Sequence, residues 1–143
     1  MKILAFETSC DDTSVAIFEN DKLLAMHTKS QIKIHNETGW VVPEVAAREH
    51  ANVIFEVVDE VLNEANLKMS DINYIWVTTN PGLMPSLLTW ITVARTFANI
   101  LKIPLFEINH IQAHIFSNFF IIVFAFSYIF WLLFSINVFI GLL

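Results

Sequence analysis

Apolar residues at the start of the chain fall into three short runs that polar turns separate. The runs are 2–7 (KILAFE), 14–19 (SVAIFE) and 22–28 (KLLAMHT). Short runs rich in β-forming residues and joined by such turns are typical of an antiparallel meander. We therefore predict three successive strands that pair in chain order.

A helical period replaces this pattern from Pro43 onwards. Apolar residues recur at steps of three and four positions as far as Asn66, as on the buried face of an amphipathic helix. Pro43 suits a first helical turn, where its missing N–H costs nothing. We interpret the polar stretch 29–42 before it as a loop.

The remaining pattern predicts alternating strands and helices. A buried-type strand at 72–78 (INYIWVT) ends at the turn Asn80-Pro81-Gly82, and a helix at 85–102 and a strand at 104–108 follow. Three strands, helix, strand, helix and strand is the order of an actin-like, RNase H-like ATPase half-domain, an α/β fold. That order is an analogy of fold and does not determine function.

Charge divides the chain into two regions. Every Lys, Arg, Asp and Glu lies at or before Glu107, and the net charge is −6. An autonomous nucleic-acid-binding protein normally presents a basic patch, so this balance argues against one. The single Cys10 excludes a disulfide framework and fits a reducing cytoplasm, and we expect no signal peptide.

Three segments carry candidate chemistry. The acidic turn at 7–13 (ETSCDDT) is either a site for phosphate, a cation or an amine, or a solvated hairpin loop. The pair His110 and His114, four residues apart on a predicted helix, is either a metal site or two ordinary polar residues. The turn at 79–83 is either a ligand crevice beside a helix N-terminus or a plain strand-to-helix connection. We interpret His35 and His50 as solvated or helix-pairing groups.

Several motifs together resemble the TsaD family, which forms N6-threonylcarbamoyladenosine in tRNA. They occur in the family's order over about residues 1–116, as 3–16 (ILAFETSCDDTSVA), Ser30-Gln31 before His35, 41–50 (VVPEVAAREH), 77–88 (VTTNPGLMPSLL), 93–98 (VARTFA) and 104–115 (PLFEINHIQAHI).

The resemblance implies an acyltransferase that passes threonylcarbamoyl from threonylcarbamoyl-adenylate to N6 of the adenine beside the anticodon. Asp11 and Asp12 match the family's acidic pair and would be catalytic. His110 and His114 match two ligands of one divalent metal ion, iron or zinc, whose third ligand is expected to be missing from this chain. Substrate-binding residues would be Ser9, Asn80 and Gly82. The implied partners are tRNA and TsaB-like and TsaE-like subunits in the cytoplasm.

The chain departs from the family after its first domain. We predict a TsaD-like lobe at 1–116 and an apolar tail at 117–143, where 119–143 carries no charge. This tail is either the product of a frameshifted reading frame or a transmembrane helix, which needs about 20 apolar residues. If the second half of the family's fold is missing, the chain alone should be inactive. The rival functions are a non-catalytic TsaB-like scaffold and a small membrane protein with a soluble N-terminal domain.

Tryptophan is the second departure. Trp40 and Trp90 stand where the resembled family has glycine, and Trp76 stands at a small-residue position, while the chain holds only 3 Gly. We hypothesise that the codons are UGA read as glycine in the living cell, because indoles at tight glycine sites would strain the packing. The masses of native tryptic peptides across the three positions would decide this.

Overall fold

The computed structural model describes residues 1–117, except for the side chains of residues 37 and 38. The chain divides into two units, Met1–His110 and Ile111–Leu143. The predicted apolar tail lies almost wholly in residues 118–143, and both interpretations of it therefore fall outside the described residues. Within the described part, no helix has the length and apolar character that a membrane span requires.

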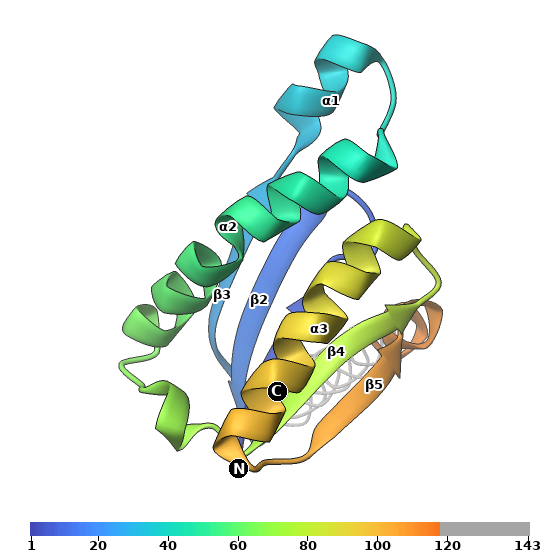
Figure 1. The fold of residues 1–143 in the computed structure, drawn as a ribbon. Helices are drawn as coiled ribbons and strands as arrows, with labels where there is room; N and C mark the ends of the chain where they lie inside the picture. The colour runs from blue at the N-terminus through green and yellow to red at the C-terminus, as the bar shows by residue number, and fades with distance from the viewer. Residues whose placement is uncertain (118–143) are drawn as a thin grey trace, which may run out of the picture. The chain divides into compact units, whose positions relative to one another are not determined.

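A five-stranded sheet in the order β3-β2-β1-β4-β5 forms the frame of the first unit (Figure 1). The predicted meander is confirmed, since β1 (Lys2–Glu7), β2 (Asp12–Glu19) and β3 (Lys22–Ser30) pair antiparallel in chain order. On the other side of β1, β4 (Tyr74–Asn80) pairs parallel with it, and β5 (Leu105–Asn109) pairs parallel with β4. The predicted α/β half-domain is therefore the fold observed.

Two long helices cover one face of this sheet, as Figure 1 shows. They are α2 (Pro43–Glu64), which begins at Pro43 as predicted, and α3 (Met84–Leu101). A short 3₁₀ turn, η1 (Met69–Asp71), connects α2 to β4, and a helical segment begins at His110 and continues to Ser117. The apolar core between sheet and helices includes Leu4, Val15, Ile17, Val57, Ile75, Leu87 and Trp90.

A further helix, α1 (Ile32–Thr38), occupies the stretch predicted to be a loop. The prediction failed because buried polar contacts hold this helix, and a hydrophobic period does not reveal them. Gln31 donates from Nε2 to the Ala46 carbonyl 3.2 Å away, and its Oε1 lies 3.0 Å from Nε2 of His35. The helix ends at Gly39, whose φ of 76° is the left-handed cap that glycine favours.

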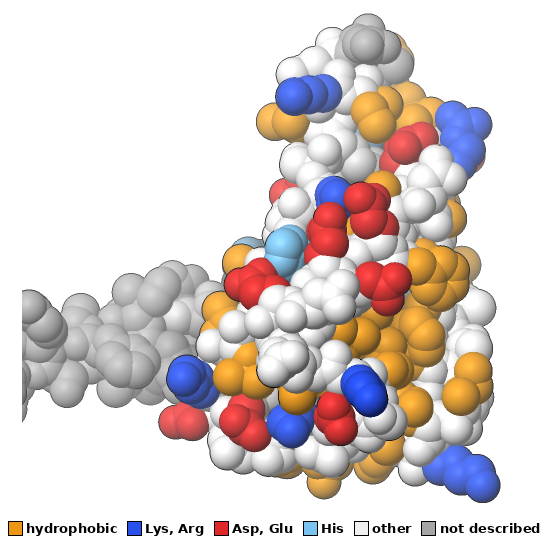
Figure 2. All heavy atoms as spheres, turned by 90° about the vertical axis from the view of Figure 1, so that its left-hand side faces the viewer, with side chains coloured by type: hydrophobic (Ala, Val, Ile, Leu, Met, Phe, Trp, Pro, Cys, Tyr) orange, Lys and Arg blue, Asp and Glu red, His pale blue; other side chains and the backbone are white. Residues whose placement is uncertain are grey.

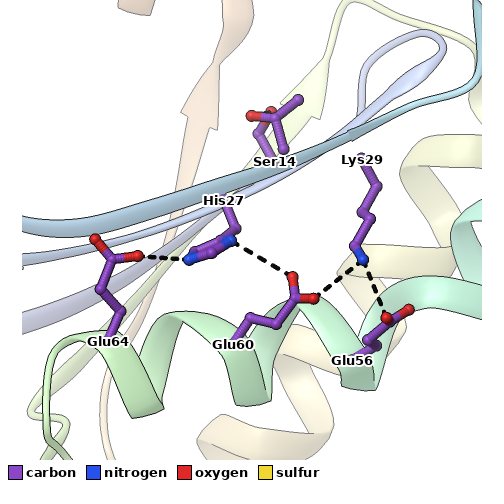
Figure 3. Close-up of polar contacts among 7 residues, drawn as sticks. Ser14, His27, Lys29, Glu56, Glu60 and Glu64 are labelled. Atoms are coloured by element: carbon purple, nitrogen blue, oxygen red, sulfur yellow. Dashed lines mark hydrogen bonds and ion pairs between the residues drawn. The ribbon is translucent and has the colours of Figure 1, made fainter.

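Outside the core, an ion-pair network joins β3 to α2 (Figure 3). The His27 ring lies between Glu60 and Glu64, and the Lys29 ammonium lies 3.0 Å from both Glu56 and Glu60. All five side chains are at least one-third exposed, so solvent screens the network. It aligns the strand with the helix and contributes little to the free energy of folding.

The three tryptophans meet different surroundings. Trp90 is 0% exposed and its ring centroid lies 4.8 Å from that of Phe6, so the indole fills the space between α3 and the sheet. Trp40 is 72% exposed and Trp76 is 38% exposed. The expectation of strained packing is therefore wrong for Trp40 and Trp76, because their side chains extend into solvent. The recoding hypothesis itself stays a prediction.

Candidate functional site

The candidate site lies where the three parallel strands end. Glu7 is the last residue of β1, Thr78 is near the end of β4, and His110 directly follows β5. Parallel strands bring their carboxyl ends to one edge of a sheet, which is where ligands collect in open α/β folds. Side chains more than one hundred positions apart in sequence therefore meet at this edge.

The Glu7 carboxylate is the centre of the contacts at this edge. Its Oε1 accepts a hydrogen bond from the Ser9 backbone N–H at 2.6 Å, and its Oε2 accepts one from the Thr78 hydroxyl. The same Oε2 lies 3.2 Å from Nδ1 of His110. Burial by itself would raise the pKa of Glu7, but the hydrogen bonds from Ser9, Thr78 and His110 outweigh it and lower that pKa.

Ser9, His110 and Glu7 resemble a nucleophilic triad in composition but not in geometry. The Ser9 hydroxyl oxygen lies 3.1 Å from Nδ1 of His110, which is the same nitrogen that faces Glu7. A catalytic triad needs the nucleophile on one ring nitrogen and the carboxylate on the other. The arrangement therefore orients the imidazole and does not activate the serine.

A shallow hollow of about 320 Å³ opens beside these residues, lined by Ser9, Cys10, Pro81, Gly82, Leu83 and His110. Its wall depends on a close approach of two loops, since the Leu83 N–H donates to the Ser9 carbonyl at 2.7 Å. A Cβ at position 82 would lie 2.5 Å from that carbonyl oxygen, so glycine is required there.

The acidic turn is anchored from behind by His50 of α2. The side chain is 0% exposed, with Nδ1 2.6 Å from the Thr13 hydroxyl and Nε2 3.0 Å from the Cys10 carbonyl. Because a carbonyl only accepts, Nε2 carries the hydrogen and Nδ1 accepts from Thr13. The interpretation of His50 as a solvated or helix-pairing residue is therefore wrong. His35 is 5% exposed and so is not solvated, but its ring does pair along its own helix, with Gln31 four positions earlier.

Burial is the main influence on the imidazole of His50. It lowers the pKa of His50, although the Cys10 carbonyl and the carboxylates of Asp11, Asp12 and Glu7 act in the opposite direction. The hydroxyls of the turn face inward with it, and Asp12 is exposed. The turn is therefore not a plain solvated hairpin: its threonines and serine are buried, Ser9 also lines the hollow, and its two aspartates lie outside that lining.

Comparison with known proteins identifies the family. The family model described as TsaD, tRNA N6-adenosine threonylcarbamoyltransferase, matches residues 22–126. The chain belongs to the TsaD family. Curated relatives with that name are 48% identical in Persephonella marina, 45% in Prosthecochloris aestuarii and 48% in Clostridium novyi, each over 83% of this chain. The chain spans about a third of their length, 34–35%.

Solved structures agree with the fold. YeaZ from Pseudomonas aeruginosa superposes with a TM-score of 0.60 at 22% identity, over 76% of this chain and 42% of that one. A second structure, of an uncharacterised protein with similarity to peptidase YeaZ from Pseudomonas aeruginosa, also gives 0.60, at 25% identity over 76% of this chain and 43% of that one. This likeness concerns the architecture, which is that of an actin-like half-domain.

The structure brings together some of the residues predicted from the family and not others. Ser9, Gly82 and His110 share the hollow, while Asn80 does not line it and instead accepts a hydrogen bond from Asn109 at 3.2 Å. His114 belongs to the second unit, where its carbonyl accepts from Ser117 at 2.9 Å.

Sequence reasoning placed Glu7 in the acidic turn but did not identify it as the partner of His110. It also did not identify Cys10 as a residue that lines the hollow, or His50 as the residue that anchors the acidic turn. The position of Glu7 at the end of a predicted inner strand was a usable signal, because the carboxyl ends of neighbouring parallel strands lie at the same edge of a sheet.

The described residues contain no cluster of three or more His, Cys, Asp or Glu that could hold a metal ion. They do contain one half of the usual arrangement, in which a metal-binding histidine turns its second ring nitrogen to a carboxylate. Nδ1 of His110 faces Glu7 in this way. The chemistry of His110 therefore fits a metal ligand that would bind through Nε2.

Proposed function

We propose that this chain serves threonylcarbamoyl transfer to tRNA, taking the group from threonylcarbamoyl-adenylate to N6 of the adenine beside the anticodon. The observation that carries the proposal is the hollow at the carboxyl edge of the sheet, where a carboxylate-oriented histidine adjoins a loop that only glycine can form. Membership of the TsaD family supports this reaction, and the hollow supports a location for it on the chain.

Different residues would bind the substrate, accept the proton and hold the metal ion. Ser9 and Gly82 would form the wall against which the acyl-adenylate lies, with Asn80 at the end of β4 as a further substrate contact. Asp11 and Asp12 would accept the proton that the exocyclic amine loses, a task for which a carboxylate open to the incoming base is suited. His110 and His114, spaced by four residues in a helical segment, would hold one iron or zinc ion.

When bound, that ion would polarise a carbonyl oxygen of the acyl group. The chain's own contribution is orientation: the Ser9–Leu83 hydrogen bond fixes the wall, and Glu7 fixes the imidazole. Contacts within the chain hold both groups, which lowers the cost of ordering the site.

Charge makes partner subunits part of this proposal. Acidic side chains gather in the middle of the face turned to the viewer in Figure 2, and the whole chain has a net charge of −6. Lys and Arg supply most of the electrostatic affinity for phosphate, so we infer that TsaB-like and TsaE-like subunits and other parts of the enzyme make most of the contacts that bind tRNA. The location that goes with this reaction is the cytoplasm.

A chimera tests the proposal. Residues 1–116 would replace the aligned segment of the Persephonella marina relative, and threonylcarbamoyladenosine in tRNA would be measured after addition of partner subunits and threonylcarbamoyl-adenylate. We expect transfer, and we expect its loss on the double change Asp11→Asn and Asp12→Asn. A folded chimera that binds its partners but leaves tRNA unmodified would refute the proposal and favour a scaffold.

The metal assignment has its own test in the same chimera. Replacement of His110 or His114 by Ala should remove bound iron or zinc while the fold survives, because loss of one ligand weakens such a site by orders of magnitude. His27→Ala is the matched control, since His27 lies in the ion-pair network on β3. Full metal content in the double Ala variant would contradict the assignment.

A further inference from the structure

The contacts of Glu7 point to a role beyond holding loops together. Three groups on three segments converge on one carboxylate: the Ser9 backbone N–H, the Thr78 hydroxyl and Nδ1 of His110. The backbone N–H can only donate, and a carboxylate with ordinary ionisation can only accept. The geometry of this cluster therefore favours a hydrogen on every group that faces Glu7, including Nδ1 of His110.

We propose that Glu7 is the positioning residue of the site: it fixes His110 as the Nδ1–H tautomer and sets its ring orientation, so that Nε2 carries the lone pair offered to a ligand. The family assignment does not state this role. Its consequence for acyl transfer rests on the function proposed above, whereas the tautomer is a property of the chain alone.

The Ser9 hydroxyl offers the opposing influence on the ring. Its oxygen lies 3.1 Å from Nδ1, where it could donate to an unprotonated nitrogen. In that arrangement the lone pair of Nδ1 would face Oε2 of Glu7 at 3.2 Å, which is repulsive. When Nδ1 of His110 is protonated, the Ser9 hydroxyl oxygen and Oε2 of Glu7 both accept from its N–H. Glu7 therefore determines the tautomer, because the Ser9 hydroxyl can rotate to suit either form.

The position of Glu7 makes the constraint firm. The carboxylate ends a central strand, β1, that is paired on both sides, and His110 follows β5 directly. Each oxygen already has a donor on a neighbouring segment, so the carboxylate has little freedom to turn away. A side chain held in this manner can impose one tautomer on its neighbour.

The test compares two carboxylate changes in the 143-residue chain. Glu7→Gln keeps the size of the side chain and removes the acceptor-only group. Glu107→Gln is the matched control, because Glu107 lies on β5 close to His110 in sequence but pairs with Arg95 at 2.9 Å. The readout is the nitrogen chemical shifts and ring couplings of histidines labelled with ¹⁵N, which distinguish the two neutral tautomers.

We expect Nδ1–H for His110 in the unmodified chain and in Glu7→Gln a shift towards Nε2–H, the tautomer that a neutral histidine side chain prefers in water. Glu107→Gln should leave the tautomer unchanged. If Glu7→Gln fails to fold, Glu7→Asp keeps the charge but withdraws it by one methylene, and the same shift is expected. An Nε2–H tautomer in the unmodified chain, or an unchanged Nδ1–H tautomer in the Glu7 variants, would overturn the proposal.

A second measurement connects the tautomer to ligand binding. Calorimetric titration with zinc should show binding about 10–100-fold weaker in Glu7→Gln than in the unmodified chain, and unchanged binding in Glu107→Gln. Equal affinity in all three chains would overturn the positioning role even if the tautomer shifts. Failure of the chimera to modify tRNA would overturn the proposed function and leave both of these results standing.

Discussion

Removing the imidazole of His50 should destabilise the fold more than any other single histidine change in the described residues. The side chain is fully buried in α2 and makes hydrogen bonds at both ring nitrogens, to the Thr13 hydroxyl and the Cys10 carbonyl. In His50→Ala the fully buried Thr13 hydroxyl and the part-buried Cys10 carbonyl lose this partner. An unpaired buried hydroxyl costs about 1–3 kcal/mol, the lost hydrogen bond to the carbonyl costs about 1 kcal/mol, and the cavity left by the ring adds to this cost.

The expected loss is therefore about 3–5 kcal/mol, which is a large share of the roughly 5–15 kcal/mol of a typical domain. The control is His27→Ala. Its ring is about one-third exposed and its partners are the solvent-screened Glu60 and Glu64, so its loss should stay below about 1 kcal/mol. Urea unfolding followed by tryptophan fluorescence measures both values.

The pH dependence follows from the lowered pKa of His50. In the unfolded chain a histidine titrates near pKa 6.5, whereas burial lowers the pKa of folded His50, so the unfolded chain binds more protons in between. Stability from this group is complete above about pH 6.5 and is lost as pH falls towards the folded pKa, by about 1.4 kcal/mol per pH unit. His50→Gln has no titrating ring and should lack this slope. Equal slopes in the two chains, or a loss in His50→Ala no larger than in His27→Ala, would refute the reasoning.

Three further changes test other parts of the structure. Gly82→Ala should cost about 1–3 kcal/mol and shift the amide resonances of Ser9, since the new Cβ would lie 2.5 Å from the Ser9 carbonyl; an unshifted spectrum would contradict this. Trp90→Phe should change the free energy of unfolding by less than about 1 kcal/mol. The smaller ring buries less apolar area, but the change also removes an indole N–H that has no partner among the described residues. Trp90→Ala should cost about 3–5 kcal/mol. Lys29→Met should lower the melting temperature slightly, and the difference should vanish with added salt; a difference that persists in salt would mean that the pairs with Glu56 and Glu60 are not screened.

The order of strands and long helices followed from the sequence because each has a local period. The start of α2 at Pro43 and the three-strand meander are examples, and both depend on neighbouring residues alone. Helix α1 was missed because its reason is tertiary: buried Gln31 binds the Ala46 carbonyl, which no period announces. Trp40 was misjudged for a related reason, since a family's glycine does not reveal whether the position faces the core or solvent.

The residues of the site could also be predicted only in part. His110 and Gly82 were found because their motifs are short and contiguous, and both line the hollow. The partnership of Glu7 with His110 spans 103 positions, so nothing in either neighbourhood signals it. His50 was placed on a solvated surface because its own helix is amphipathic and mixed in charge around it, yet the carbonyl it binds belongs to a turn 40 positions earlier.

The sheet order has a consequence for how the chain acquires its site during synthesis. The three N-terminal strands pair with neighbours in sequence, so they can form as soon as about the first quarter of the chain has left the ribosome. Strand β1 must then wait with one edge open until β4 arrives, and Glu7 must wait longer still for His110. Closing so long a loop is slow relative to hairpin formation. We therefore expect an early meander that lacks the site, with the Glu7–His110 contact among the last to form. In a nascent chain, that contact would be a marker of completed folding.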